Sequence, residues 1–383
     1  MTVLHYISDL THTSSMTKTV MRMIQATSKT VDLHLLTSVS LSEDTVASLK
    51  EQLGVTVHVI GVEKGANPLH YIEYYKKVRA CVLDVNPHIV HVHGSWDIRP
   101  AIVQRCASRN NMVTIVSPHK GMSPEIIDID FWKSRLWRIL AYQAMMISKS
   151  TAVVAVNEKE KNDILNLGLK RRIEVMPAVT SEQTLWDLGT ALVETYRKAL
   201  DSSYRRFLQK EERAFLKAAV KKAVVDAGVK VEIPSLNGLS FRRISFLAYD
   251  EGATELMQRG ADKSGIYLPE AIDVANTLRY KTRKAKILKS LDEMSQSMEV
   301  SRIPESQVEE RRAVRLISKA KELTLKRLTL NNWVELYELF RHSDFNEDIV
   351  AEELRRRKLK GFTKKLQRRL AGRFELKEGY VIF

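Results

Sequence analysis

The sequence predicts an α/β protein in which a doubly wound parallel sheet occupies residues 1–179 and a mainly helical region occupies residues 180–383. Two observations predict the sheet. Short apolar runs rich in β-branched residues alternate with longer segments of helical spacing. Several of these runs also stop abruptly in polar clusters, as buried strands do at the edge of a parallel sheet. The alternation ends near Val179, so we expect a domain boundary there.

The first strand is predicted over Val3–Ile7, and a polar loop then leads into the helix Met16–Thr27. Caps and stops bound the later elements, such as Ser42 before a helix and Gly54 after it. In chain order, these elements are predicted over Val31–Thr37, Ser42–Leu53, Val55–Ile60, Leu69–Val85, Ile89–Val92, Pro100–Arg109, Met112–Val116, Phe131–Lys149, Thr151–Val156, Glu158–Leu167 and Ile173–Met176. Strands and helices of this length in alternation favour right-handed crossovers between parallel strands.

After Thr180 the pattern becomes charged and amphipathic with helical spacing. The predicted helices lie over Leu185–Gly228 (one or two helices), Phe241–Gly260, Pro269–Met294, Arg302–Leu330, Leu330–Arg341 and Glu347–Ala371. A second, mainly helical domain is therefore expected.

Two polar clusters follow neighbouring strands of the predicted sheet. His93-Gly94-Ser95 comes after the run Ile89–Val92, and a second cluster, from Ser117 to Gly121, comes after Met112–Val116. Ligands bind at the carboxyl ends of parallel strands, so we expect a site where these clusters meet. His91 shares one side of its strand with His93, but a metal site needs at least a third ligand. No third ligand is evident in the sequence, and no metal site is predicted.

Four segments carry a family resemblance: HVHGSWDIRPA, SPHKGMSPE, AVNEKEKNDILNLGL and RIEVMPAV. In this order, across Met1–Val179, they resemble the acceptor-side domain of retaining nucleotide-sugar glycosyltransferases of family 4, a Rossmann-like domain of the GT-B type. The family usually has an uninterrupted His-Gly pair where Lys120 stands, and "iPNGv" where Met176–Val179 stands. The second half does not match the family's donor-binding domain, which has a "GR" loop and two glutamates seven residues apart.

The resemblance implies transfer of a hexosyl group from a nucleoside diphosphate sugar to a polysaccharide or lipid-linked acceptor in bacterial surface glycan synthesis, without a cofactor. It implies that His119 is the catalytic residue, facing the donor sugar. The other residues expected to bind substrate are Ser14, Ser15, His93, Gly94, Ser95, Trp96, Lys120 and Gly121. The partners would then be a nucleotide sugar donor and a glycan or lipid-linked acceptor.

Plainer interpretations of the same residues stay open. Ser14 or Ser15 could simply cap a helix, Trp96 could be a structural residue at the domain rim, and Lys120 an exposed lysine. The missing donor-binding motifs also favour an alternative function, a catalytically degenerate transferase fold that acts as a binding or scaffold subunit. Arg242, Arg243 or Glu251 could replace the missing phosphate and ribose contacts.

The chain is basic, with a formal net charge of +15, and residues 181–383 hold 40 lysines and arginines against 30 acids. Such a surface can attract nucleic acid, anionic lipid or anionic substrate, or only keep the protein in solution. The segment Ala351–Arg373 is the most basic, with ten cations against two acids. Its apolar residues recur at spacings of three to five; they are Leu354, Leu359, Phe362, Leu366 and Leu370.

This stripe could lie on an anionic membrane surface, or dock onto the protein's own helices with the cations left in water. Nucleic acid is not expected as a partner, because no nucleic-acid-binding fold or aromatic interleaving is recognised. The N-terminus resembles no signal peptide, and no run reaches the roughly 20 apolar residues that span a bilayer. We expect a cytoplasmic protein, peripheral at the inner face of the plasma membrane, with Cys81 and Cys106 as reduced thiols.

Overall fold

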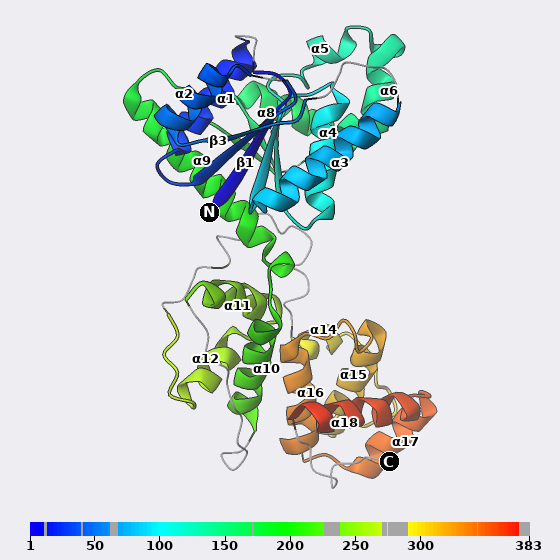
Figure 1. Cartoon of the computed structure of the whole chain (residues 1–383). Helices are drawn as coiled ribbons and strands as arrows, with labels where there is room; N and C mark the ends of the chain where they lie inside the picture. The colour runs from blue at the N-terminus through cyan, green and yellow to red at the C-terminus, as the bar shows by residue number, and fades with distance from the viewer. Residues whose placement is uncertain are drawn as a thin grey trace. The chain divides into compact units, whose positions relative to one another are not determined.

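The structure, a computed structural model, describes residues 1–10, 14–39, 41–61, 68–170, 172–225, 238–269, 274, 290–342 and 344–374. The chain divides into two compact units, which we call the sheet unit (Met1–Arg206) and the helical unit (Phe207–Phe383) (Figure 1). The last strand ends at Val175, four residues before the boundary expected at residue 179, and the two units divide after Arg206. Helix α9 (Glu182–Ser202) belongs to the sheet unit, because it packs on α1 (Ser15–Thr27).

Seven parallel strands form one sheet in the order β3-β2-β1-β4-β5-β6-β7. The strands are β1 (Thr2–Ile7), β2 (Asp32–Thr37), β3 (Thr56–Val59), β4 (Ile89–His93), β5 (Val113–Ser117), β6 (Ala152–Ala155) and β7 (Ile173–Val175). The predicted doubly wound parallel sheet is confirmed. Its register pairs His5 with His91 and His93 with Ser117.

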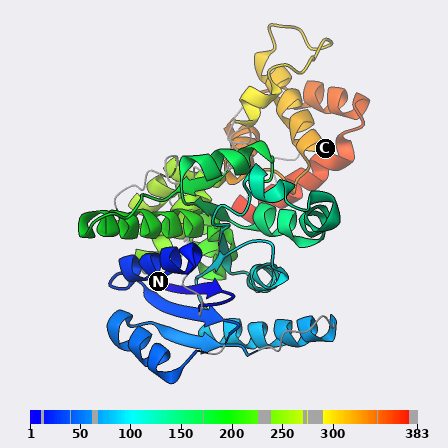
Figure 2. The same ribbon diagram turned by 90° about the horizontal axis from the view of Figure 1, so that it is seen from above.

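Helices cover both faces of the sheet (Figure 2). On one face, α3 (Pro68–Val85) and α4 (Ile98–Arg109) pack on side chains such as Tyr6 and Val92. Successive side chains of a strand point to opposite faces, so His5, His91 and His93 point to the other face, that of α9. The remaining helices of this unit are α2 (Glu43–Leu53), α5 (Pro124–Asp128), α6 (Leu136–Arg138), α7 (Ala144–Lys149) and α8 (Glu158–Asn166). Two π-helical turns, η1 (Phe131–Arg135) and η2 (Ile139–Gln143), interrupt the predicted helix Phe131–Lys149.

The described residues of the helical unit form helices and connecting turns and no strand, which confirms the predicted helical character. The helices are α10 (Lys210–Val224), α11 (Gly238–Asp250), α12 (Thr254–Asp262), α14 (Leu291–Ser295), α15 (Val308–Leu323), α16 (Leu330–His342), α17 (Glu347–Arg356) and α18 (Lys360–Phe374). Most of the helix predicted over Pro269–Met294 lies outside the described residues. The one or two helices predicted over Leu185–Gly228 are two, α9 and α10, separated by a 3-10 turn over Tyr204–Arg206.

The basic segment Ala351–Arg373 is not one continuous helix. Lys358, at φ 59°, stands in the break between α17 and α18. Leu354, Leu366 and Leu370 are fully buried, because α18 packs against α10, α16 and α17. Most of the apolar stripe is therefore core of the helical unit, in agreement with the alternative that it docks onto the protein's own helices. Among the described residues, no helix is both long enough and apolar enough to cross a bilayer.

Candidate active site

The loop after β4 begins with a glycine that the geometry requires. Gly94 has φ 102°, and its N–H donates a hydrogen bond to the Ser117 carbonyl at the end of β5 (2.9 Å). A side chain is strained at this backbone angle. A Cβ atom on Gly94 would also lie 3.5 Å from Met16 Sδ, so the start of α1 adjoins this loop.

The loop after β5 packs directly against the loop after β4. The Ser95 hydroxyl donates to the Pro118 carbonyl (3.2 Å), and the Gly121 N–H donates to the same oxygen (3.1 Å). A Cβ atom on Gly121 would overlap the Ser95 side chain. The two polar clusters therefore meet at the sheet edge, as the sequence predicts, and Gly121 is what allows the close approach.

Trp96 is held by several contacts. It has φ 65°, its N–H donates to Gln143 Oε1 (3.0 Å), and its indole Nε1 donates to the Gly121 carbonyl (2.5 Å). The Tyr142 hydroxyl donates to the Trp96 carbonyl (2.9 Å), and the Arg135 guanidinium lies 4.4 Å from the centre of the ring. The indole is thus fixed at the rim of the loop with a cation over one face.

Ser14 is the N-cap of α1, and its hydroxyl accepts a hydrogen bond from the Thr17 N–H (3.1 Å). Ser15 is the first residue of that helix and is exposed. The structure gives Ser14 the capping role that its residue type favours. Through Met16 it also places both serines beside the loop at Gly94.

A chain of hydrogen-bonded side chains runs through the buried face of the sheet to this edge. In order, its six members are Ser117, His91, Tyr196, His5, His93 and His119. The first part begins at Ser117 Oγ, at the carboxyl end of β5, 2.9 Å from His91 Nε2. His91 Nδ1 lies 2.9 Å from the Tyr196 hydroxyl, which lies 3.4 Å from His5 Nε2. Tyr196 of α9 thereby bridges two histidines on neighbouring strands.

The outer part of the chain leads to His119. His5 Nδ1 lies 2.9 Å from His93 Nε2, and the two ring planes are within 3° of parallel. His93 Nδ1 lies 3.0 Å from His119 Nε2. His119 has φ 52°, and its remaining nitrogen, Nδ1, is buried without a hydrogen-bond partner among the described residues.

These histidines are neutral at physiological pH. Burial lowers the pKa of His5 to about 3 and that of His119 to about 4. Burial and the neighbouring histidines hold the pKa values of His91 and His93 well below 6.5. Burial also raises the pKa of the Tyr196 hydroxyl, so it keeps its proton.

Neutral imidazole has one donor nitrogen and one acceptor nitrogen, so when the Tyr196 hydroxyl donates to one of its two histidines and accepts from the other, the whole chain of hydrogen bonds runs in one direction or the other. In the first direction, each group donates outward from Ser117, and His119 Nδ1 carries a proton. In the second, each group donates inward from His119, and Nδ1 is an acceptor. Whether His119 Nδ1 is a donor or an acceptor at the sheet edge therefore depends on groups that lie within the core, Tyr196 and His5 among them.

His5, His91 and His93 also place three ring nitrogens within 4.8 Å of one another. The sequence shows only the pair on β4, and the structure adds His5 from β1 as the third. Both ring nitrogens of each histidine are already hydrogen-bonded, however. A metal ion would have to replace these bonds, so the donor set fits a hydrogen-bonded chain better than a resident metal.

Glu160 fixes the loop that carries His119 and Lys120. Its carboxylate accepts from the Lys120 N–H (2.5 Å) and the Val156 N–H (2.8 Å). Glu160 is buried, and burial raises the pKa of its carboxyl. Lys120 has φ 64°, and its side chain is exposed. The hydrogen bond that its N–H donates to Glu160 therefore holds an unusual backbone conformation while the ammonium reaches solvent.

Sequence reasoning missed three members of this arrangement: His5, Tyr196 and Glu160. His5 stands in an otherwise apolar strand, which is a local signal for a buried polar group, but only the register of the strands in the sheet reveals its partner. Tyr196 lies 105 residues from His91, and no local pattern connects them. Of the residues considered as replacements for the donor contacts, Arg243 pairs with Glu212 (2.6 Å), and Glu251 accepts from the Leu330 N–H (3.1 Å).

Comparison with known proteins identifies the part of the chain that holds this site. Residues 16–180 match the model of Glycosyltransferase Family 4. The match contains both loops, His119 and Glu160, and it ends before α9 and the helical unit. No curated protein matches the sequence.

Similar solved structures include UDP-GlcNAc 2-epimerases. The Methanocaldococcus jannaschii enzyme in complex with UDP-GlcNAc and UDP is 15% identical, with 59% of this chain and 54% of that chain covered and a TM-score of 0.35. The Neisseria meningitidis enzyme bound to UDP-GlcNAc is 14% identical over 72% of this chain and 74% of that one (TM-score 0.36). A Staphylococcus aureus MnaA–UDP structure is 8% identical over 58% of each chain (TM-score 0.36). The chain thus spans a little over half of two of these relatives, and so distant a likeness carries no functional argument.

Proposed function

We propose that the protein is a glycosyltransferase that moves a hexosyl group from a nucleoside diphosphate sugar to a polysaccharide or lipid-linked acceptor in bacterial surface glycan synthesis. The family match over residues 16–180 supports the transferase class. The observation that carries the proposal is His119 Nδ1, a buried nitrogen without a partner in the described structure, at the sheet edge where parallel sheets bind ligands.

A retaining transfer of this kind needs the donor sugar held, positive charge at the anomeric carbon tolerated, and the leaving phosphate stabilised. His119 Nδ1 serves the first need by hydrogen-bonding a sugar hydroxyl. It serves the second because its lowered pKa keeps the ring neutral and adds no positive charge beside the developing cation. The exposed ammonium of Lys120 supports the third by attracting the diphosphate.

The remaining predicted residues shape the site. Gly94 and Gly121 bring the two loops together. Ser95 and Trp96 hold the loops in register and offer a hydroxyl and an indole edge to the acceptor. Ser14 and Ser15 supply polar groups at the start of α1 beside Gly94.

The test is the substitution His119→Ala, assayed as transfer of labelled hexose from a panel of nucleoside diphosphate sugars. We expect a loss of roughly 10²-fold or more in kcat/KM, since the lost contact is made to the reacting sugar. His58→Ala is the matched control, because His58 is also hydrogen-bonded to a histidine, His34 (3.0 Å), but lies on the edge strand β3. Circular dichroism checks the fold of both variants. Equal rates for His119→Ala and the unmodified protein would remove His119 from the site.

A second candidate function is a degenerate transferase fold that serves as a binding or scaffold subunit. The observation in its favour is the helical unit, whose described residues form no strand where the family has its donor-binding sheet. Calorimetry with UDP-glucose and UDP-N-acetylglucosamine separates the two functions. Saturable binding that His119→Ala weakens favours the enzyme, and no binding at millimolar concentration favours the scaffold.

A lipid-linked acceptor would place the transferase at the inner face of the plasma membrane. Since Leu354, Leu366 and Leu370 are buried in the helical unit, membrane contact through residues 351–373 would be electrostatic only. Exposed cations such as Lys364 and Arg368 supply on the order of 1 kcal/mol each near an anionic surface. Sedimentation with anionic vesicles should then fall steeply as salt is raised.

A further inference from the structure

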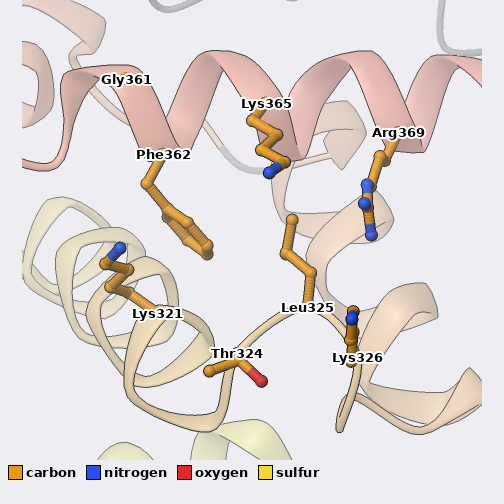
Figure 3. A pocket seen from close by; sticks show the side chains of 8 residues that line it. All are labelled: Lys321, Thr324, Leu325, Lys326, Gly361, Phe362, Lys365 and Arg369. Carbon is orange, nitrogen blue, oxygen red and sulfur yellow. The ribbon is translucent and has the colours of Figure 1, made fainter.

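The helical unit contains a surface pocket of about 520 Å³ that is lined by cations (Figure 3). It lies between α18 and the turn that follows α15. Lys365 and Arg369 point into it from α18, and Lys321 and Lys326 approach from the other side. The remaining lining residues are Thr324, Leu325, Gly361 and Phe362, so no acid lines the pocket.

None of these four cations has an ion pair with a described acid, in contrast to Lys319, Arg356 and Arg357 nearby. Lys319, two residues before Lys321, pairs with Glu322 at 2.8 Å. Arg356 and Arg357 pair with Glu353 at 2.5 and 2.7 Å. Glu322 and Glu353 thus neutralise the cations beside them, whereas no described acid offsets the repulsion among the four cations of the pocket. An anion in the pocket would relieve that repulsion.

The floor of the pocket is apolar and its backbone is unusual. Leu325 is buried, and the Lys321 ammonium lies 5.4 Å from the centre of the Phe362 ring. Thr324 has φ 64° and ψ 145°, a region that β-branched residues rarely adopt. Its hydroxyl-bearing side chain lines the pocket beside the cations. A ligand with an anionic group next to an apolar or ring portion would match this arrangement.

We propose that this pocket is a binding site for a phosphate-bearing ligand, with Lys321, Lys326, Lys365 and Arg369 contacting the phosphate oxygens. Four cations suit the charge of a phosphate monoester or diphosphate, and a guanidinium can hold two of its oxygens at once. Phe362 and Leu325 take the adjoining portion of the ligand. The phosphate can belong to a soluble ester or to a lipid headgroup, which present the same chemistry. The proposal is independent of the transferase activity.

The test compares two double variants of the full-length chain that remove the same charge from α18. The pocket variant, Lys365→Gln with Arg369→Gln, removes the charge of two side chains that line the pocket. Lys364→Gln with Arg368→Gln removes two exposed cations of the same helix that do not line the pocket. Binding of pyrophosphate is measured by calorimetry, and binding to phosphatidylcholine vesicles with and without phosphatidic acid by sedimentation, both in 150 mM salt.

We expect the pocket variant to lose at least tenfold in affinity for pyrophosphate or for vesicles with phosphatidic acid, while the control variant stays within about twofold. The probe that shows this dependence identifies the source of the phosphate. We also expect the pocket variant to keep or raise its melting temperature without ligand, because no ion pair is lost. Equal losses in both variants, no saturable binding of either probe, or tighter pocket-dependent binding of a single-stranded oligonucleotide would overturn the proposal.

Discussion

The two units differ in the buried titratable groups that stand out in each. In the sheet unit, His5, His91 and His93 are fully buried, and each is hydrogen-bonded as a neutral ring. In the helical unit, two buried carboxylates are paired with arginines. Glu212 is fully buried against Arg243 at 2.6 Å, and Glu353 is bound by two arginines, with hydrogen bonds that lower its pKa to about 2.

The difference shows what each unit can tolerate. A chain of neutral hydrogen bonds holds no net charge, so salt has little to screen, but any added proton disrupts it. A buried ion pair tolerates mild acid, yet it depends on both partners, since a lone buried charge is costly. The sheet unit should therefore be sensitive to pH and the helical unit to loss of a partner. The three predictions below test this contrast.

The largest effect should be acid destabilisation confined to the sheet unit. His5 and His119 have pKa values of about 3 and 4 in the folded protein, below the ordinary 6.5. The unfolded chain therefore takes up protons below pH 6.5 that the folded chain does not, and stability present above 6.5 is lost as the pH falls. At pH 5.5 each of the two costs about 1.4 kcal/mol. His91 and His93 add in the same direction, and Glu160, with its raised pKa, opposes them.

Hydrogen exchange followed by mass spectrometry at pH 7.5 and 5.5 measures each unit separately. The helical unit contains only one histidine, His342. It also holds Glu335, whose pKa is raised to about 7 by burial, so that protonation stabilises the folded form as the pH falls through 7. Protection of the helical unit should hold or rise while that of the sheet unit falls. A parallel fall in both units would contradict the contrast.

An intermediate effect is expected from Arg243→Met in the helical unit. The substitution keeps much of the side-chain bulk but leaves the Glu212 carboxylate buried without its cation. The free energy of unfolding should fall by about 3–5 kcal/mol, as measured by urea denaturation. Lys319→Met is the control, because its ion pair with Glu322 is at the surface and should contribute under about 1 kcal/mol. Similar losses in the two variants would mean that burial does not decide how much an ion pair contributes to the free energy of unfolding.

The smallest change in stability, but the most specific, should come from Tyr196→Phe. Removal of the hydroxyl leaves His91 Nδ1 and His5 Nε2 without their common partner, at a cost of about 1–3 kcal/mol. It also cuts the chain, so the tautomer of His119 should change, which ¹⁵N chemical shifts of labelled histidine measure. Tyr6→Phe is matched, since its hydroxyl bonds Ser38 (3.0 Å) and touches no histidine. An unchanged His119 tautomer in Tyr196→Phe would refute the coupling.

The sequence by itself determined the organisation of the sheet unit. Strands and helices differ in the period of their apolar residues, and caps such as Ser42 and stops such as Gly54 bound them locally. The same local signals placed His93, Ser95 and Gly121 at strand ends, and the parallel topology brings strand ends to one edge. It determined the helical character of the second half for the same reason.

Only the tertiary structure decided which of these residues work together. His5 and Tyr196 join the site through strand register and the packing of α9 on α1, over separations of 88 and 105 residues. The stripe that begins at Leu354 has a period that suits a membrane or a core equally, and packing of α18 on α10, α16 and α17 chose the core. The period of the apolar residues indicates which side of a helix or strand is apolar. The element that covers this side comes from a distant part of the chain, so no local pattern predicts the contact.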